Sequence, residues 1–144
     1  MAGPPQAVLD ILRERLARRP EILEAYCFGS QAREEATAHS DLDLAVYVDR
    51  EGLPPAPYGY AAGLTAELMA GLGVDRLDVV VLNHAPPLLY QRVLRDGERL
   101  LSRDLAATTT REGRALSRYC DYRQQLRKVD RALAGRLADG SFGR

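Results

Sequence analysis

Three short segments with the character of β-strands most strongly limit what this chain can fold into. They are Ile22–Phe28, Ser40–Val48 and Arg76–Leu82, and their length and apolar, β-branched or aromatic residues are typical of buried strands. Segments with a helical pattern of apolar residues lie before, between and after them. Strands separated by helices indicate an α/β or α+β domain built on a central sheet.

Apolar residues recur at helical spacing in four further segments. We expect helices over residues 8–16, from Pro57 to Gly71 or Gly73, from Pro86 to Gly97, and from Asp104 to about residue 138. A short strand over Glu98–Ser102 should follow the third helix, and Gly29–Glu35 can form a short helix that begins at Ser30. The last helix carries a long apolar stripe, with Gly113 as the candidate position for a break.

The length and the charge balance of the chain exclude several classes of protein. Its 144 residues predict a single domain over residues 1–144, with a core over about residues 5–103 and a C-terminal helical segment over about residues 104–138. The 20 basic and 20 acidic residues cancel, so the chain has no general attraction to nucleic acid or to anionic membranes. No segment approaches the roughly 20 apolar residues that span a bilayer. We therefore expect a cytoplasmic protein with no membrane contact and no direct nucleic-acid partner.

The cysteines and the aromatic and basic residues of the last helix have plain structural interpretations. Cys27 and Cys120 lie far apart without a paired-cysteine motif, which argues against a disulfide scaffold or a zinc site, and we expect both to be small buried side chains. Packing is the favoured interpretation, and contact with a partner the alternative, for Tyr119 and Tyr122. A solvated helix face is the favoured interpretation, and a basic surface for a partner the alternative, for Arg111, Arg114, Arg118 and Arg123.

Three aspartates are the candidate catalytic residues. The two-residue period of a strand places Asp41 and Asp43 on the same face of the second strand. Asp78 interrupts an apolar strand, where an unpaired carboxylate is costly and needs an explanation. Asp75 is an alternative third carboxylate, but it precedes the strand and fits a turn better.

Such a cluster of carboxylates predicts a magnesium site. Mg²⁺ prefers hard oxygen ligands and needs only a few of them, and a cation relieves the repulsion between neighbouring carboxylates. Two ions about 3.5–4 Å apart would bind both the attacking and the leaving oxygens of a phosphoryl transfer. Asp78 would lie beside the attacking hydroxyl, as a metal ligand and candidate general base. His39 and His84 border these segments, but nitrogen ligands suit Mg²⁺ poorly.

The turn after the first strand provides candidate phosphate ligands. Gly29 lacks a Cβ and allows close approach of backbone to a triphosphate, while Ser30 adds a hydroxyl at the start of a helix. Arg33, one turn further on, is either a phosphate ligand or a surface charge. Ser40 can hydrogen-bond the phosphates or the loop, and both roles remain open.

The spacing of these residues resembles that of a known superfamily. A Gly-Ser pair, ten intervening residues, an Asp-x-Asp pair and a later strand aspartate are similar to the pattern of the DNA polymerase beta nucleotidyltransferases. The short chain, with its GSQAR, SDLDLAV and RLDVVVLN segments, resembles the minimal nucleotidyltransferase (MNT) antitoxins over about residues 5–125. Glu34 departs from the pattern, because many members have a small residue there.

This resemblance implies a fold, an activity and a partner. The fold would be a small mixed central sheet flanked by helices, with a long C-terminal helix. The activity would be Mg²⁺-dependent transfer of AMP from ATP to a tyrosine of a HEPN ribonuclease toxin, which would be silenced within a hetero-oligomer. One alternative keeps the chemistry with a small acceptor such as an aminoglycoside, although such enzymes usually carry an added substrate domain. The other is a non-catalytic antitoxin that blocks the toxin sterically.

Overall fold

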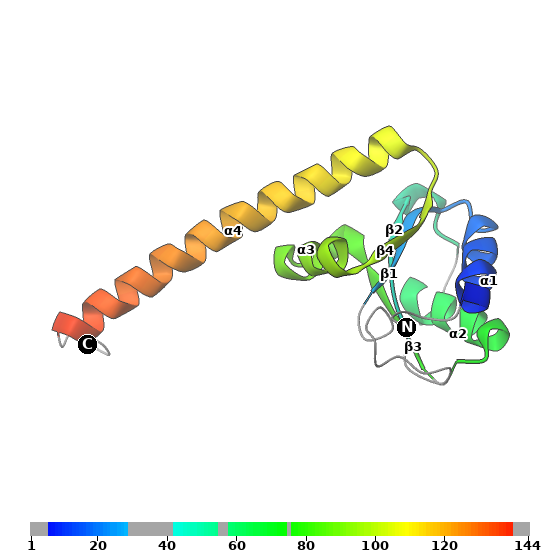
Figure 1. The fold of residues 1–144 in the computed structure, drawn as a ribbon, viewed down its shortest axis with the longest axis horizontal. Helices are drawn as coiled ribbons and strands as arrows, with labels where there is room; N and C mark the ends of the chain where they lie inside the picture. Colours follow the sequence, from blue (N-terminus) through cyan, green and yellow to red (C-terminus); the bar gives the residue numbers. More distant parts are fainter. Residues whose placement is uncertain (1–5, 29–41, 55–57, 75, 140–144) are drawn as a thin grey trace.

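A four-stranded mixed sheet forms the centre of the computed structural model, which describes residues 6–28, 42–54, 58–74 and 76–139 (Figure 1). The strands lie in the order β3-β2-β1-β4. Their bounds are β1 Ile22–Phe28, β2 Leu42–Val48, β3 Leu77–Val81 and β4 Glu98–Ser102. The α-helices are α1 Gln6–Ala17, α2 Tyr60–Leu72, α3 Pro87–Asp96 and α4 Leu105–Asp139, with short 3₁₀ turns η2 at Arg50–Gly52 and η3 at Leu82–His84. The predicted mixed α/β fold with a long C-terminal helix is confirmed.

The strand pairing explains why the sheet is mixed. β1 runs antiparallel to both β2 and β4, whereas β2 and β3 are parallel and are joined through α2. In this arrangement the carboxyl end of β1 lies beside the amino end of β2, where Phe28 pairs with Asp43. The amino ends of β2 and β3 are further tied by a 3.0 Å hydrogen bond from the Leu42 amide to the Arg76 carbonyl. Three strands therefore meet at one end of the sheet.

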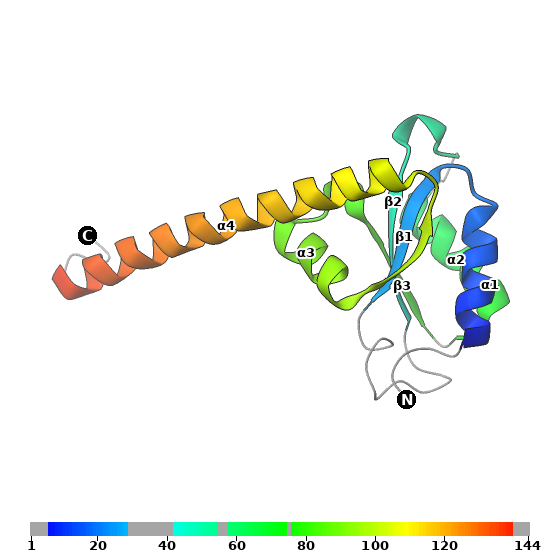
Figure 2. The same cartoon turned by 45° about the horizontal axis from the view of Figure 1, so that its top comes forward.

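Helices cover both faces of the sheet (Figure 2). The alternation predicted for the second strand is confirmed: Leu42, Leu44, Val46 and Val48 pack with the leucines of α1 and α2, while Ala45 and Tyr47 lie on the other face. That second face is covered by α3 and the first part of α4, where Tyr90, Val93 and Ala115 are buried.

One strand is less buried than its sequence predicts. We expected β3 to be covered on both faces, but Val79, Val80 and Val81 are only partly buried. The reason is that β3 lies at an edge of the sheet, with β2 as its single neighbour among the described strands. An edge strand lacks the second row of neighbouring side chains that a central strand receives.

The helix boundaries follow local chemistry. α2 ends at Gly73, whose φ of 65° is in the left-handed region that favours glycine. α3 begins at Pro87 and ends before Gly97, where an added Cβ would lie 2.5 Å from the Val93 carbonyl oxygen. Arg103 caps the C-terminal end of α1, because its guanidinium donates hydrogen bonds to the carbonyl oxygens of Leu16, Ala17 and Arg19. The predicted start of α2 at Pro57 is wrong, because this helix begins three residues later, at Tyr60, with Gly59 as its N-cap residue.

The C-terminal helix continues without a break from Leu105 to Asp139, so the candidate break at Gly113 is wrong. A single glycine costs a helix only about 1 kcal/mol. The turns on either side of Gly113 are held by the buried residues Thr108 and Ala115. The first turns lie over the sheet and α3, and the rest extends away from the other elements (Figures 1 and 2). Apolar residues on the extended part are exposed, namely Leu126, Val129, Leu133 and Leu137. No helix in the described part of the chain combines the length and apolarity that crossing a membrane requires.

Candidate functional site

Two of the three predicted catalytic aspartates lie side by side. Asp43 of β2 and Asp78 of β3 are partners in the parallel register. Paired residues on neighbouring strands project from the same face of a sheet, and the strands are about 4.8 Å apart, so both carboxylates project from the same face. This is the face covered by α3 and α4, because the next residues on the same side of the two strands are Ala45 and Val80.

The two carboxylates differ in environment. Asp43 is half-buried between neighbouring strands, next to Phe28 of β1. The side chain of Asp78 is 50% exposed at the edge of the sheet, with the Arg76 guanidinium 3.4 Å from its carboxylate. Asp43 therefore has the more fixed position, and Asp78 is the more accessible to a second molecule.

The remaining predicted site residues fall in one stretch of chain. Residues 29–41 connect Phe28 to Leu42, two strand ends that adjoin Asp43. This stretch contains Asp41 together with the candidate phosphate ligands, and it lies outside the described residues. The roles predicted for these residues stay predictions: Gly29, Ser30, Arg33, Ser40 and Asp41.

The described carboxylates suit a magnesium ion in type and in placement. Carboxylate oxygens are the ligands Mg²⁺ prefers, and two from adjacent strands leave room for water and phosphate oxygens. Within the described ranges no group of three candidate metal ligands is found, and the predicted third carboxylate, Asp41, is outside those ranges. Asp43 and Asp78 are thus the described residues that could hold the ion.

Three further candidates from the sequence are His84, His39 and Asp75. His84 is at the wrong end of the sheet for the site, because η3 follows the carboxyl end of β3 and Asp78 lies at the amino end. The His84 ring instead contacts the Arg50 guanidinium. His39 and Asp75 lie outside the described residues.

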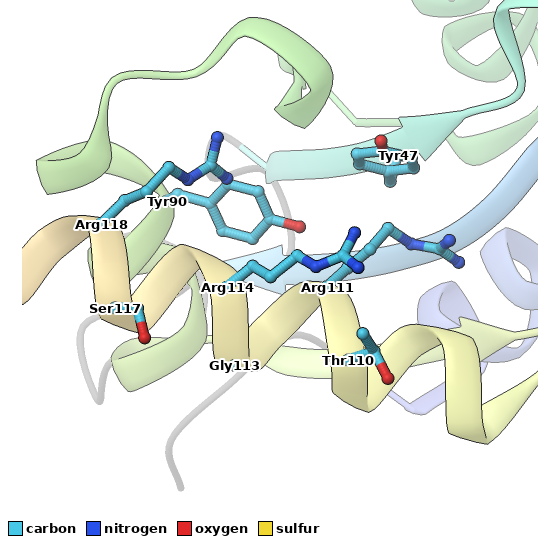
Figure 3. A pocket seen from close by; sticks show the side chains of 8 residues that line it. All are labelled: Tyr47, Tyr90, Thr110, Arg111, Gly113, Arg114, Ser117 and Arg118. Atoms are coloured by element: carbon cyan, nitrogen blue, oxygen red, sulfur yellow. The ribbon is translucent and has the colours of Figure 1, made fainter.

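The sequence interpretation missed a second polar feature on the same face. A pocket of about 780 Å³ lies between α4, α3 and β2 (Figure 3). Its walls include two tyrosines and three arginines, namely Tyr47, Tyr90, Arg111, Arg114 and Arg118. The signal was present in the spacing of the arginines, since positions three and four apart share one face of a helix. The solvated face favoured by the sequence pattern is thus not the whole description, because three of these arginines line a pocket.

Comparison with known proteins identifies the family. The model of the family "Polymerase beta, Nucleotidyltransferase" matches residues 11–106. The protein adenylyltransferase MntA of Aphanizomenon flos-aquae (strain 2012/KM1/D3) is 32% identical over 89 residues. That alignment covers 58% of this chain and 59% of the relative, so the chain matches less than two thirds of this curated relative.

Solved structures share the fold. The MNT antitoxin in complex with a tri-AMPylated HEPN toxin of Shewanella oneidensis has a TM-score of 0.65 at 21% identity, covering 90% of this chain and 98% of that one. A toxin–antitoxin structure with AMP-PNP gives 0.64 at 21% identity, with the same coverage. An MntA–HepT structure gives 0.60 at 20% identity, covering 93% of this chain and 99% of that one.

The family match covers residues 11–106, which include the whole sheet and therefore both Asp43 and Asp78. The structural matches extend over nine-tenths of the chain and include known MNT antitoxins. This chain belongs to the polymerase beta nucleotidyltransferase family and has the fold of the MNT antitoxins.

Proposed function

We propose that this chain is an antitoxin that transfers AMP from ATP to a tyrosine of a cognate HEPN-family ribonuclease toxin and so silences it. The observation that carries the proposal is the cross-strand pair of Asp43 and Asp78 on one face of a nucleotidyltransferase sheet. Its relatives support a protein as the acceptor of AMP, because one is a protein adenylyltransferase and another is bound to an AMPylated HEPN toxin.

The carboxylates supply the charge pattern that nucleotidyl transfer needs. Asp43 and Asp78, together with Asp41, would hold one or two Mg²⁺ ions, and bound Mg²⁺ neutralises charge on the triphosphate. Gly29, Ser30 and Arg33 would hold the triphosphate through amide, hydroxyl and guanidinium donors. Ser40 would hydrogen-bond a phosphate oxygen.

The exposure of Asp78 suits it to the acceptor side of the reaction. The acceptor tyrosine oxygen attacks the α-phosphorus of ATP, a new P–O bond forms, and the bond to the β-phosphate oxygen breaks. Pyrophosphate leaves with its electron pair, and the phenolic proton passes to the Asp78 carboxylate. Asp78 can approach an incoming protein because its side chain is half-exposed at an edge strand, whereas Asp43 remains on the nucleotide side.

The extended part of α4 offers a surface for the toxin. Leu126, Val129 and Leu133 recur three and four residues apart, which is the spacing of a helix–helix seam. With Leu137 they form what we call the distal stripe, and its members are 39–61% exposed. Long helices in water are normally stabilised by packing of an apolar face, and a contiguous exposed apolar strip is typical of a protein-binding surface.

The decisive experiment uses the product of the neighbouring gene as acceptor. That protein is incubated with this chain, Mg²⁺ and ATP, and its intact mass is measured. The proposal predicts an increase by one or more AMP units, which is lost in the variants Asp43→Asn and Asp78→Asn. Asp10→Asn is the matched control, because Asp10 is exposed on α1, a helix that packs on the opposite face of the sheet.

Each alternative predicts a different result from the same reaction. A steric antitoxin would bind the partner and leave its mass unchanged with wild-type protein. A small-molecule enzyme would move the label of radioactive ATP into a low-molecular-weight product and leave the partner unlabelled. Either result would contradict the proposed protein acceptor.

A further inference from the structure

The pocket beside α4 is large and its walls come from three elements. Tyr47 of β2 and Tyr90 of α3 form one side, and residues of α4 between Thr110 and Arg118 form the other (Figure 3). Its volume of about 780 Å³ is within the range of about 300–1,000 Å³ typical of small-molecule sites. It is too large for an inorganic anion alone and suits a ligand with an organic part.

The charge in this pocket is positive. Arg111 donates to the buried carboxylate of Glu24 at 2.8 and 2.6 Å, so these two charges compensate each other. Arg114 and Arg118 have no carboxylate partner among the described residues, and the Arg118 guanidinium lies 5.9 Å from the centre of the Tyr90 ring. Two uncompensated guanidiniums on one wall favour an anion with several oxygen atoms.

The Tyr90 hydroxyl is an independent indication that this pocket takes a polar ligand. Tyr90 is 1% exposed, and its Oη has no hydrogen-bond partner within the described structure. Buried hydroxyls are nearly always paired, so an unpaired one needs an explanation. Figure 3 shows this hydroxyl directed toward the space beside Arg114. Burial, together with the negative charge of Glu24, raises the pKa of Tyr90 well above its usual value, which keeps the hydroxyl protonated as a donor.

The pocket is separate from the carboxylate pair. Tyr47 follows Asp43 by four residues on the same face of β2, which corresponds to about 13 Å along a strand. None of the residues that line the pocket is acidic. A group that packs against Tyr47 would therefore lie well away from Asp43 along β2.

We propose that this pocket is a second nucleotide site, which takes a nucleoside monophosphate through its phosphate group. Arg114 and Arg118 neutralise the phosphate, and the Tyr90 hydroxyl donates a hydrogen bond to one of its oxygens. The Tyr47 ring forms an apolar wall for the nucleoside. The Arg111 guanidinium lies 4.8 Å from the centre of this ring. This site goes beyond the proposed transfer reaction, since it needs neither the metal nor the toxin.

Calorimetric titration with AMP tests the site. The titrations are done without Mg²⁺ and without a partner protein, on the whole chain. AMP is expected to bind, inorganic phosphate to compete with it, and adenosine to give no binding. The double variant Arg114→Gln/Arg118→Gln should weaken AMP binding by about tenfold or more, because both charge-assisted contacts are lost. Arg127→Gln/Arg131→Gln makes the same change on the exposed part of α4 and should leave the affinity unchanged.

The variant Tyr90→Phe separates a binding role from a packing role. It removes a buried oxygen that has no partner, so the thermal midpoint of the ligand-free protein should stay the same or rise. Its affinity for AMP should nevertheless fall by about fivefold, because one hydrogen bond to an anion is lost. A tyrosine that only fills space would show unchanged AMP affinity.

Three results would overturn the proposal. These are an absence of AMP binding at millimolar concentration, an equal loss of affinity in the Arg127→Gln/Arg131→Gln control, and AMP binding that is abolished by Asp43→Asn. The last result would place the nucleotide at the carboxylate pair. Because the titration involves no transfer step, failure of the proposed adenylyltransferase activity would leave its outcome intact.

Discussion

Glu24 in the middle of β1 is fully buried, and its carboxylate accepts two hydrogen bonds from Arg111 of α4, at 2.8 and 2.6 Å. The Thr108 hydroxyl, one turn earlier on the helix, donates a third at 2.9 Å. These contacts join residues 84 and 87 positions apart. They fix the first turns of α4 on the same sheet face that carries Asp43, and so they shape the pocket between α4 and β2.

Loss of the Arg111 side chain should destabilise the fold strongly. Arg111→Leu leaves the buried Glu24 carboxylate without its charge partner, which typically costs about 3–5 kcal/mol. Urea denaturation followed by circular dichroism would measure the change in the free energy of unfolding. Arg114→Leu is the matched control, since Arg114 is an exposed arginine on the same helix without a described carboxylate partner. Glu24→Leu/Arg111→Leu should recover part of the loss, and a double variant as unstable as the single one would contradict this explanation.

Much of the fold could be predicted because it depends on local pattern. The periods of the apolar residues located every described strand and α-helix, and Gly73 and Gly97 ended their helices as expected. The position of β3 at the sheet edge could not be predicted, because Val79–Val81 suit a central and an edge strand equally well. The break expected at Gly113 was wrong, because tertiary contacts on both sides of a glycine are invisible in the sequence.

The site could be predicted only in part. The two-residue period separated Asp43 from the leucines of β2, and the structure pairs Asp43 with Asp78, while the catalytic roles of both residues stay predictions. The spacing of the arginines indicates a shared helix face, but the pocket at Tyr90 also needs α4 to cross α3, and that crossing depends on the Glu24–Arg111 contact between distant residues. Tyr119 and Tyr122 are partly buried rather than fully packed.

Magnesium and nucleotide should stabilise the protein through the carboxylate pair. A ligand that binds only the folded state raises its stability, and at about one hundred times Kd the thermal midpoint should rise by about 9 °C. We expect this shift with Mg²⁺ and a non-hydrolysable ATP analogue, and its loss with EDTA or in Asp43→Asn. Differential scanning fluorimetry would measure it, with Asp10→Asn as the control. A shift of equal size in Asp43→Asn would exclude this residue as a metal ligand.

The distal stripe of α4 should decide whether the toxin binds. Leu126→Asp/Leu133→Asp places two charges in the middle of the stripe and should weaken partner binding by more than about a hundredfold, as loss of central interface residues does. Both leucines are already about 40% exposed, so the free energy of unfolding of the free chain should change little. Gln125→Asp/Gln124→Asp adds the same charge at polar positions and is the control. Binding is measured by surface plasmon resonance.

Light scattering on the free chain distinguishes the partner from a second copy of the chain. The proposal expects the chain without toxin to be monomeric at micromolar concentration. A dimer that Leu126→Asp/Leu133→Asp dissociates would show instead that the distal stripe is covered by another copy.

Glu21 should contribute to the loss of stability in acid. Burial alone would raise its pKa, but hydrogen bonds from the Tyr60 hydroxyl at 2.7 Å and from Arg19 at 2.8 Å outweigh burial and hold the pKa of Glu21 below its ordinary value of 4.5. The stabilisation is therefore complete above pH 4.5 and is lost as the pH falls through the lower pKa of the folded state. Glu21→Gln should be less stable at pH 7 and should lose less stability between pH 5 and pH 3 than the wild type. Urea midpoints across this range would measure the difference, and parallel curves for the two proteins would contradict the assignment.

The two cysteines should differ sharply in reactivity. We had expected both to be buried, but only Cys27 is, at 1% exposure, while Cys120 lies exposed on α4. Burial, reinforced by the negative charges of Glu98 and Asp43, raises the pKa of the Cys27 thiol to about 12. Because the thiolate is the reactive form, iodoacetamide at pH 8 should alkylate Cys120 within minutes and Cys27 only after unfolding in urea. Peptide mass mapping of timed samples would follow both sites. Equal rates in the native protein would mean that β1 opens readily, which its central place in the sheet argues against.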